Sequence, residues 1–359
     1  MQPGRILVYT LMAASVVPQL RGADKPVKAI ASQGISLSSS GRNYALPIYV
    51  SNGNLSQSQP SITRALIVFH GKLRNAETYN QSGLEAIKRA GSAAQGTLLI
   101  TPQFLEQVDA DAYRLPNHIL RWANEDWVSG ANAANASLST YDAIDAILDS
   151  LGNRRLFPNL KIVVLAGHSA GGQLLQRYAV VGRAGDLLAK AGIRVRYVIA
   201  NPSSYLYFSP ERPVLKPQAE FTFEVPEQKC SGNYNRWKYG PINPPPYAAS
   251  ADFSAFESRY VQREVVYLLG DKDIDPNHPE LDKSCAGEDE GPYRFFRGNA
   301  YLRYLQLRHP ELATVTAAQQ LWAVPGVGHD GEKMLNSACG LAALFDAGRC
   351  ETRILEPKP

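Results

Sequence analysis

The sequence predicts an α/β fold in which helices cover both faces of a mostly parallel central sheet. Apolar runs of strand length alternate along the chain with segments of helical periodicity, as in sheets whose strands are joined by helical crossovers. Several runs are continuously apolar, which is typical of strands buried on both faces. Because ligands bind beyond the carboxyl ends of such strands, the residues directly after each run are candidates for a site.

The first part of the chain contains a predicted β-hairpin and two buried strands. The hairpin pairs residues 35–37 with residues 44–50. An apolar run at 64–69 then ends at His70, and a helical pattern leads to the next strand at 97–100. Both runs suit strands that are buried on both faces of a parallel sheet.

The middle of the chain combines an irregular segment with a helix and a strand. Residues 108–137 include two tryptophans and many Asn and Gly residues, and we interpret them as a long surface excursion. Ser139 and Asp142 form a capping-box-like pair that opens a helix with one apolar face. The run 162–165 predicts the next strand, which leads into a turn and a further helix.

The last part of the chain contains an insertion between predicted strands. A strand at 195–200 is followed by residues of about 203–257, which are rich in proline and aromatic side chains and lack periodicity. We expect this insertion to be a loop-rich lid over the carboxyl edge of the sheet. Strands at 265–269 and 320–324 follow, and a helix from about 332 to 345 ends the fold.

Composition limits the classes of function. The net charge of +4 is spread over 359 residues without a Lys/Arg block, so we expect no nucleic-acid partner. Residues 1–23 have the layout of a secretory signal peptide, with Arg5 before an apolar run. We therefore predict a secreted or periplasmic protein with a single domain over 24–359 and no stable membrane span after cleavage. An uncleaved anchor is the alternative.

All four cysteines lie in the C-terminal half of the chain. In an exported protein an even number of cysteines indicates disulfides, and of the three possible pairings we favour Cys230–Cys285 with Cys339–Cys350. The sequence has neither a C-x-x-C motif nor a Cys/His cluster, so it predicts no zinc site.

The segment Gly167–Gly172 reads G-H-S-A-G-G between a predicted strand and a predicted helix. A serine at the tip of such a turn has a strained backbone, and the residues two before and two after it must be very small. Gly167 and Gly171 meet that requirement. We therefore predict that Ser169 is a nucleophile, and a glycine-rich turn without a catalytic role is the alternative.

A serine nucleophile needs a base that takes its proton and a carboxylate that orients the base. Asp273 and His329 each come shortly after a predicted strand, in the chain order Ser169, Asp273, His329. With the His70–Gly71 pair that follows an earlier strand, these motifs resemble those of the α/β-hydrolases. The resemblance covers nearly everything from residue 35 to residue 345.

The resemblance implies a role for each of these residues. His329 would be the base and Asp273 its orienting acid, because a glycine, two residues and an aspartate is the family's usual spacing. The backbone N–H groups of Ala170 and Lys72 would form the oxyanion hole. His70 would brace the loop that carries the second of these N–H groups. No cofactor and no metal are implied.

The identity of the acid has alternatives. Asp271 and Asp275 are also plausible acids, and together with Asp273 they have the spacing of a calcium loop that would end at Asp282. Pro276 stands where such a loop needs a glycine, so we favour the acid over the calcium ligand.

Together these residues predict a serine hydrolase that cleaves small or polymeric carboxylic esters through an acyl-enzyme. The same triad could cleave an amide, a peptide or a polyester such as polyhydroxyalkanoate, and a non-catalytic binding protein is a third interpretation. Trp237 and Tyr239 of the insertion are predicted to contact the substrate, the alternative being that they only pack the lid. His118, His278 and His309 are expected to be surface or hydrogen-bonded histidines.

Overall fold

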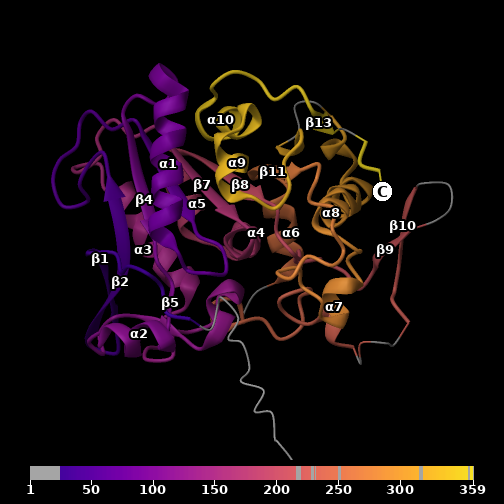
Figure 1. Ribbon diagram of the computed structural model, residues 1–359, viewed down its shortest axis with the longest axis horizontal. Helices are drawn as coiled ribbons and strands as arrows, with labels where there is room; N and C mark the ends of the chain where they lie inside the picture. The colour runs from indigo at the N-terminus through magenta and orange to yellow at the C-terminus, as the bar shows by residue number, and fades with distance from the viewer. Residues whose placement is uncertain are drawn as a thin grey trace, which may run out of the picture.

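The described residues build a nine-stranded sheet with helices on both faces (Figure 1). The computed structural model describes residues 25–358 except 216–219, 228–229, 231, 250–251, 315–317 and 355. The predicted leader, residues 1–23, lies outside the described residues. The strand order is β1-β2-β4-β3-β7-β8-β11-β12-β13. Their bounds are β1 Gln33–Ser39, β2 Arg42–Ser51, β3 Arg64–Phe69, β4 Thr97–Pro102, β7 Ile162–His168, β8 Arg194–Ala200, β11 Glu264–Gly270, β12 Gln319–Val324 and β13 Arg353–Ile354.

The centre of the sheet is parallel and its edges are antiparallel. Strands β4, β3, β7, β8, β11 and β12 pair in parallel with their neighbours in that order. Strands β1, β2 and β13 add antiparallel pairs at the edges. The mostly parallel sheet and the N-terminal hairpin predicted from the sequence are therefore confirmed. The shorter strands β5 Leu105–Glu106, β6 Arg121–Trp122, β9 Arg212–Leu215 and β10 Phe221–Glu224 form two separate pairs.

Alternate residues of each central strand pack into two hydrophobic cores, because successive side chains of a strand point to opposite faces. In β3, Leu66 and Val68 belong to one core, whereas Ile67 and Phe69 belong to the other. The first core is covered by α1 Ala76–Ala90, α9 Gly331–Asn336 and α10 Ala338–Phe345. The second is covered by α3 Thr140–Gly152, α4 Ala170–Val181, α5 Ala184–Lys190, α6 Phe253–Tyr260 and α8 Arg294–Arg308.

The excursion at 108–137 is more ordered and more deeply packed than we predicted. It overlaps α2 Gln107–Tyr113 and contains the 3₁₀ helix η3 Asn124–Ser129. Trp122 and Trp127 are fully buried, and the Trp127 ring lies 4.7 Å from the ring of His70. The segment is therefore part of the packing beneath the end of β3, since large aromatic side chains gain most from burial. The capping box of Ser139 and Asp142 at the start of α3 is confirmed.

The final helix predicted from the sequence is two helices. Ser337 has an extended backbone between α9 and α10, and its hydroxyl accepts a hydrogen bond from Gly340 N at 2.9 Å. A β-carbon on Gly340 would lie 2.3 Å from the carbonyl oxygen of Met334, so the two helices turn on a residue that has to be glycine. The prediction missed this break because no proline or glycine stands at Ser337 itself.

The two disulfides have the predicted pairing. Cys339 at the start of α10 is bonded to Cys350, which precedes edge strand β13. Cys230 of the insertion is bonded to Cys285, the first residue of the short helix α7 Cys285–Glu288. The insertion also contains the β9–β10 hairpin and the 3₁₀ helices η5 Asn233–Asn235 and η6 Pro246–Ala248. Its central part is therefore tied to the segment that follows β11.

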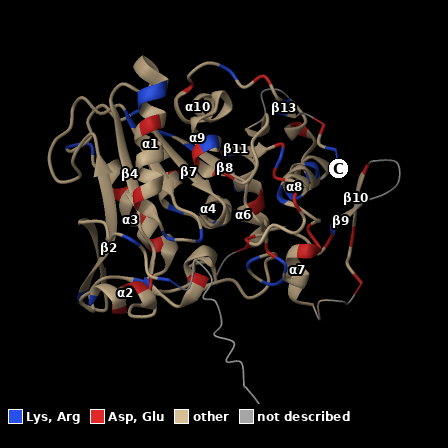
Figure 2. Ribbon diagram, viewed as in Figure 1, with Lys and Arg blue, Asp and Glu red and all other residues tan. Residues whose placement is uncertain are grey.

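Charged residues of both signs are interspersed along the described chain (Figure 2). This distribution accords with the small net charge of the whole sequence, +4. No helix in the described part of the chain combines the length and the apolar character that crossing a membrane requires.

Candidate active site

Ser169 lies at the tip of a sharp turn between β7 and α4. Its backbone φ is 58° and its ψ is −119°, a left-handed region that a residue with a side chain rarely adopts. The turn is closed on both sides by backbone. A β-carbon on Gly167 would lie 2.3 Å from the carbonyl oxygen of Gly171, and one on Gly171 would lie 2.5 Å from that of His70. Only glycine fits at these two positions, as the sequence indicated.

A chain of hydrogen bonds joins Ser169 to two residues from the ends of other strands. The Ser169 hydroxyl lies 2.9 Å from Nε2 of His329, which follows β12. Nδ1 of the same imidazole lies 2.8 Å from Oδ2 of Asp273, which follows β11. Because β7, β11 and β12 belong to one parallel set, their carboxyl ends meet at one edge of the sheet. The structure thus brings together the three residues that the sequence singled out.

The electrostatics of these hydrogen-bonded residues favour an ionised Asp273 and a neutral His329. Burial by itself would raise the pKa of Asp273, but its hydrogen bond with His329 and the charge of Arg294 lower the pKa below its usual value. Burial lowers the pKa of His329, and this effect outweighs the opposing hydrogen bond with Asp273. A neutral imidazole that is oriented by a carboxylate can accept the proton of a serine hydroxyl.

Asp271 and Asp275 have other partners. Asp271 Oδ1 accepts a hydrogen bond from Gly326 N at 2.8 Å, and Asp275 Oδ1 accepts one from Asn277 N at 2.8 Å. Asp273 alone of these three aspartates is bonded to His329 within the described residues. The geometry therefore places Asp273, as we favoured, beside the histidine. The carboxylates of Asp271, Asp273 and Asp275 thus bind three different partners. This arrangement disfavours the calcium-loop alternative, in which they would share one ion.

Two further histidines surround His329. His168 Nδ1 lies 3.0 Å from the Tyr79 hydroxyl, and the His168 ring lies 4.6 Å from the His329 ring. The His278 ring stands edge-on to His329 with the centroids 5.0 Å apart. No sequence pattern indicates that His278 lies here, since its position depends on how the loop after β11 folds back. Burial lowers the pKa of both His168 and His278, which keeps both rings uncharged near neutral pH.

His70 braces the loop that follows β3. Its Nε2 accepts a hydrogen bond from Phe104 N at 3.0 Å, and its Nδ1 lies 2.8 Å from the carbonyl oxygen of Gly71. Burial lowers the pKa of His70 to about 4, so the ring is neutral. This loop passes close to Ser169, because a β-carbon on Gly71 would lie 3.7 Å from the Ser169 β-carbon. It therefore brings the backbone of Lys72 to the same end of the sheet as Ser169 and Ala170.

Arg294, which sequence analysis missed, contacts Asp273 from behind. The side chain is fully buried, and its Nη1 lies 3.3 Å from Asp273 Oδ1. Helical spacing of Phe296, Ala300 and Tyr304 could have indicated helix α8. No local sequence pattern, however, predicts that the first residue of this helix contacts the loop after β11.

Ser169 opens into a pocket of about 370 Å³ with a largely polar lining. Lys72 Nζ lies 2.7 Å from Glu125 and 3.4 Å from Glu280, and Lys238 Nζ lies 3.2 Å from Asp282. The charges of the lining are therefore largely paired with one another. The lining residues are Lys72, Glu125, Ser169, Ala170, Gln173, Ser203, Lys238, Pro279, Glu280, Leu281, Asp282, Lys283 and Ser284.

Neither Trp237 nor Tyr239 lines this pocket, although both were predicted to contact the substrate. The Trp237 indole donates a hydrogen bond to the Ser129 carbonyl oxygen at 2.7 Å and packs against the larger core. The Tyr239 hydroxyl lies 2.7 Å from both Asp282 Oδ2 and Ser284 Oγ. Tyr239 therefore holds two residues of the lining in place from outside the pocket.

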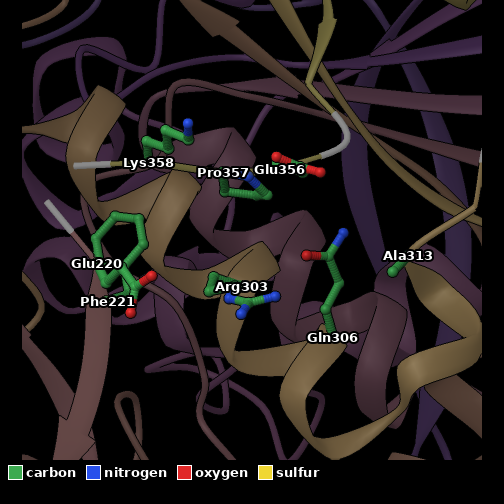
Figure 3. A pocket seen from close by; sticks show the side chains of 8 residues that line it. All are labelled: Glu220, Phe221, Arg303, Gln306, Ala313, Glu356, Pro357 and Lys358. Carbon is green, nitrogen blue, oxygen red and sulfur yellow. The ribbon is translucent and has the colours of Figure 1, made fainter.

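A second pocket, of about 420 Å³, lies apart from Ser169 and shares no residue with the first (Figure 3). Figure 3 shows Arg303 and Gln306 of α8 opposite the C-terminal residues Glu356, Pro357 and Lys358. Charges of both signs line it, and it contains none of the residues that the sequence singled out.

Comparisons with known proteins reveal similarity in structure. No family model matches the chain, and no curated protein matches its sequence. The solved structure of a poly(3-hydroxybutyrate) depolymerase from Bordetella parapertussis is 22% identical in sequence, with a TM-score of 0.57. The match covers 91% of this chain and 96% of the depolymerase chain. The structure of poly(aspartic acid) hydrolase-1 from Sphingomonas sp. KT-1 is 20% identical in sequence, with a TM-score of 0.55. That match covers 86% of this chain and 96% of the hydrolase chain.

Proposed function

On the α/β-hydrolase fold that this chain has, we propose a serine hydrolase that cleaves carboxylic esters. The observation that carries the proposal is the hydrogen-bonded chain from the Ser169 hydroxyl through His329 to Asp273. Fold alone does not specify chemistry, so we infer the reaction from these hydrogen-bonded residues and from the pocket in front of them.

In the proposed mechanism His329 accepts the Ser169 proton as the serine oxygen attacks the ester carbonyl. Asp273 holds the imidazole with Nδ1–H toward itself and stabilises the imidazolium that forms. His329 then gives the proton to the departing alcohol, and an acyl-enzyme remains on Ser169. Water, deprotonated by His329, attacks the acyl group and releases the acid together with free enzyme.

The negative oxygen that forms in each step needs donors that are already in place. We assign this role to the N–H groups of Ala170 and Lys72. Ala170 is the first residue of α4, where N–H groups have no intrahelical acceptor and the helix dipole favours negative charge. Lys72 follows Gly71, the residue that the His70 ring braces beside Ser169.

The lining of the pocket favours small polar esters over long-chain lipids. An acyl chain gains affinity from apolar surface, and this lining offers mainly charged and hydroxyl groups. Cleavage of an amide or of a polyester uses the same residues and would differ in the groups beyond the carbonyl. We further propose export from the cytoplasm, which the two disulfides support because such bonds persist in oxidising compartments.

The direct test is the variant Ser169→Ala, assayed on p-nitrophenyl esters graded by acyl length. We expect kcat to fall about 10⁴-fold, as when a triad nucleophile is removed from other serine hydrolases. Ser203→Ala is the matched control, because Ser203 lines the same pocket without a histidine partner, and we expect a loss below about 10-fold. Retention of most activity in Ser169→Ala would refute the proposal.

A further inference from the structure

Arg294 contacts the proposed acid, Asp273, and has no part in the proton transfers proposed above. Its side chain is fully buried at the start of α8. Nη1 faces Asp273 Oδ1 at 3.3 Å, and Nε donates to Ser203 Oγ at 2.9 Å. The other oxygen of the carboxylate, Oδ2, faces His329. The two oxygens of Asp273 are thus engaged on opposite sides, which fixes the rotation of the carboxylate about its χ2 angle.

The backbone supports the same contact. Phe295 N donates a hydrogen bond to the Asp273 carbonyl oxygen at 3.1 Å, and Asp273 N donates to the Gly270 carbonyl oxygen at 3.0 Å. The start of α8 is therefore bonded to the loop after β11 through both main chain and side chain. This arrangement holds Arg294 in register with Asp273.

Arg294 also contributes to the charge around His329. The titratable groups that contact this imidazole are Asp273, His168 and His278, and the charge of Arg294 acts on it from beyond Asp273. Glu280 and Arg297 are the further charged groups that act on Arg294 itself. Asp273 favours the protonated imidazole, whereas the positive charge of Arg294 disfavours it. The charge of His278, when that ring is protonated, also lowers the pKa of His329. His168 stays neutral, because burial lowers its pKa well below the usual value.

We propose that Arg294 is a positioning residue of this site: it orients the Asp273 carboxylate toward His329 and supplies a fixed positive charge behind that carboxylate. The inference rests on the proposed role of His329 as the base. An unprotonated imidazole is the form that can accept the Ser169 proton. If the charge is removed, one of the influences that oppose a protonated imidazole is lost while burial remains, so the pKa of His329 rises.

The test is the pH profile of kcat/KM on a small p-nitrophenyl ester, measured from about pH 5 to about pH 9. Activity is lost as the pH falls through the pKa of His329, so a raised pKa moves the acid limb to higher pH. We expect Arg294→Gln to move it upward by about 0.5 to 1 unit. Arg297→Gln is the matched control, because Arg297 is equally buried one turn later and bonds backbone carbonyl oxygens of Gly291, Ser203 and Asp282. We expect its acid limb to stay in place.

Arg294→Lys tests positioning separately from charge. It keeps the positive charge but loses the planar fork of donors, so we expect kcat to fall about 10-fold with the acid limb unmoved. An acid limb unmoved in Arg294→Gln overturns the electrostatic role. A wild-type kcat in Arg294→Lys overturns the positioning role, and this readout stands even if Arg294→Gln fails to fold.

Ser169→Ala, measured alongside, separates this inference from the proposed function. Ester hydrolysis that survives the loss of Ser169 removes the proposed function and the role of Arg294 with it. Hydrolysis that depends on Ser169 but keeps its acid limb in Arg294→Gln and its kcat in Arg294→Lys removes only the role of Arg294.

Discussion

Asp273 divides its two carboxylate oxygens between His329 and Arg294, and this division explains how a buried acid stays ionised. Burial alone would favour the protonated form, which could not orient the imidazole in the required tautomer. The pocket in front of these residues is polar as well, and its charged side chains form ion pairs with one another. Charged groups on both sides of Ser169 are therefore paired with groups of opposite charge.

Lys72 illustrates how a side chain and its own backbone can have separate roles. Its ammonium group bridges Glu125 and Glu280 in the lining of the pocket, whereas its N–H group is assigned to the oxyanion hole. We expect Lys72→Ala to raise KM but to change kcat by less than about 3-fold. The backbone N–H group remains in the variant, and a partly exposed ion pair contributes little free energy. Steady-state kinetics on one ester measures both parameters.

The contrary result for Lys72→Ala is a fall in kcat of about 100-fold or more, the size expected when an oxyanion donor is lost. It would mean that the ammonium group itself acts in the reaction. Glu125→Gln is the control, since it removes one partner of Lys72 and leaves Lys72 intact.

At the scale of elements, the turn between β7 and α4 depends on contact with the end of β3. A β-carbon on Gly171 would lie 2.5 Å from the carbonyl oxygen of His70 and 2.6 Å from that of Phe69. These are backbone atoms, which cannot move aside as a flexible side chain can. The turn that carries Ser169 and the loop that carries Lys72 are therefore packed as one unit.

We expect Gly171→Ala to lower the free energy of unfolding by about 1 to 3 kcal/mol, the usual cost of overpacking. Gly152→Ala is the matched control, because its β-carbon would meet only the flexible Leu188 side chain at 3.3 Å. We expect the control to lie within about 1 kcal/mol of the wild type, since alanine is the better helix former. Urea unfolding measures both, and equal stability of the two variants would contradict this account of the turn.

At the scale of the whole molecule, the parallel sheet was predictable because its strands are continuous apolar runs. The same runs located Ser169, Asp273 and His329, since each stands where a run ends. Contacts between distant segments were not predictable in this way. Arg294 meets Asp273 only because α8 packs across the sheet, and His278 meets His329 only because its loop folds back.

The position of the two aromatic residues outside this pocket also has a physical reason. Trp237 and Tyr239 are amphipathic, so a segment rich in such residues suits a binding surface and a packed core equally well. In the structure Trp237 contacts the Ser129 backbone and Tyr239 supports Asp282 and Ser284, while polar side chains line the pocket. Which of the two uses applies depends on the fold of the insertion, and no local pattern encodes it.

The central claim is that Ser169 is a nucleophile that His329 activates. The most direct measurement is covalent labelling by a fluorophosphonate, with the modified residue located by peptide mass spectrometry in the wild type and in His329→Ala. We predict one label, on Ser169, at a rate about 10³-fold lower in His329→Ala. A label on another residue, or equal rates in the two proteins, would contradict the account.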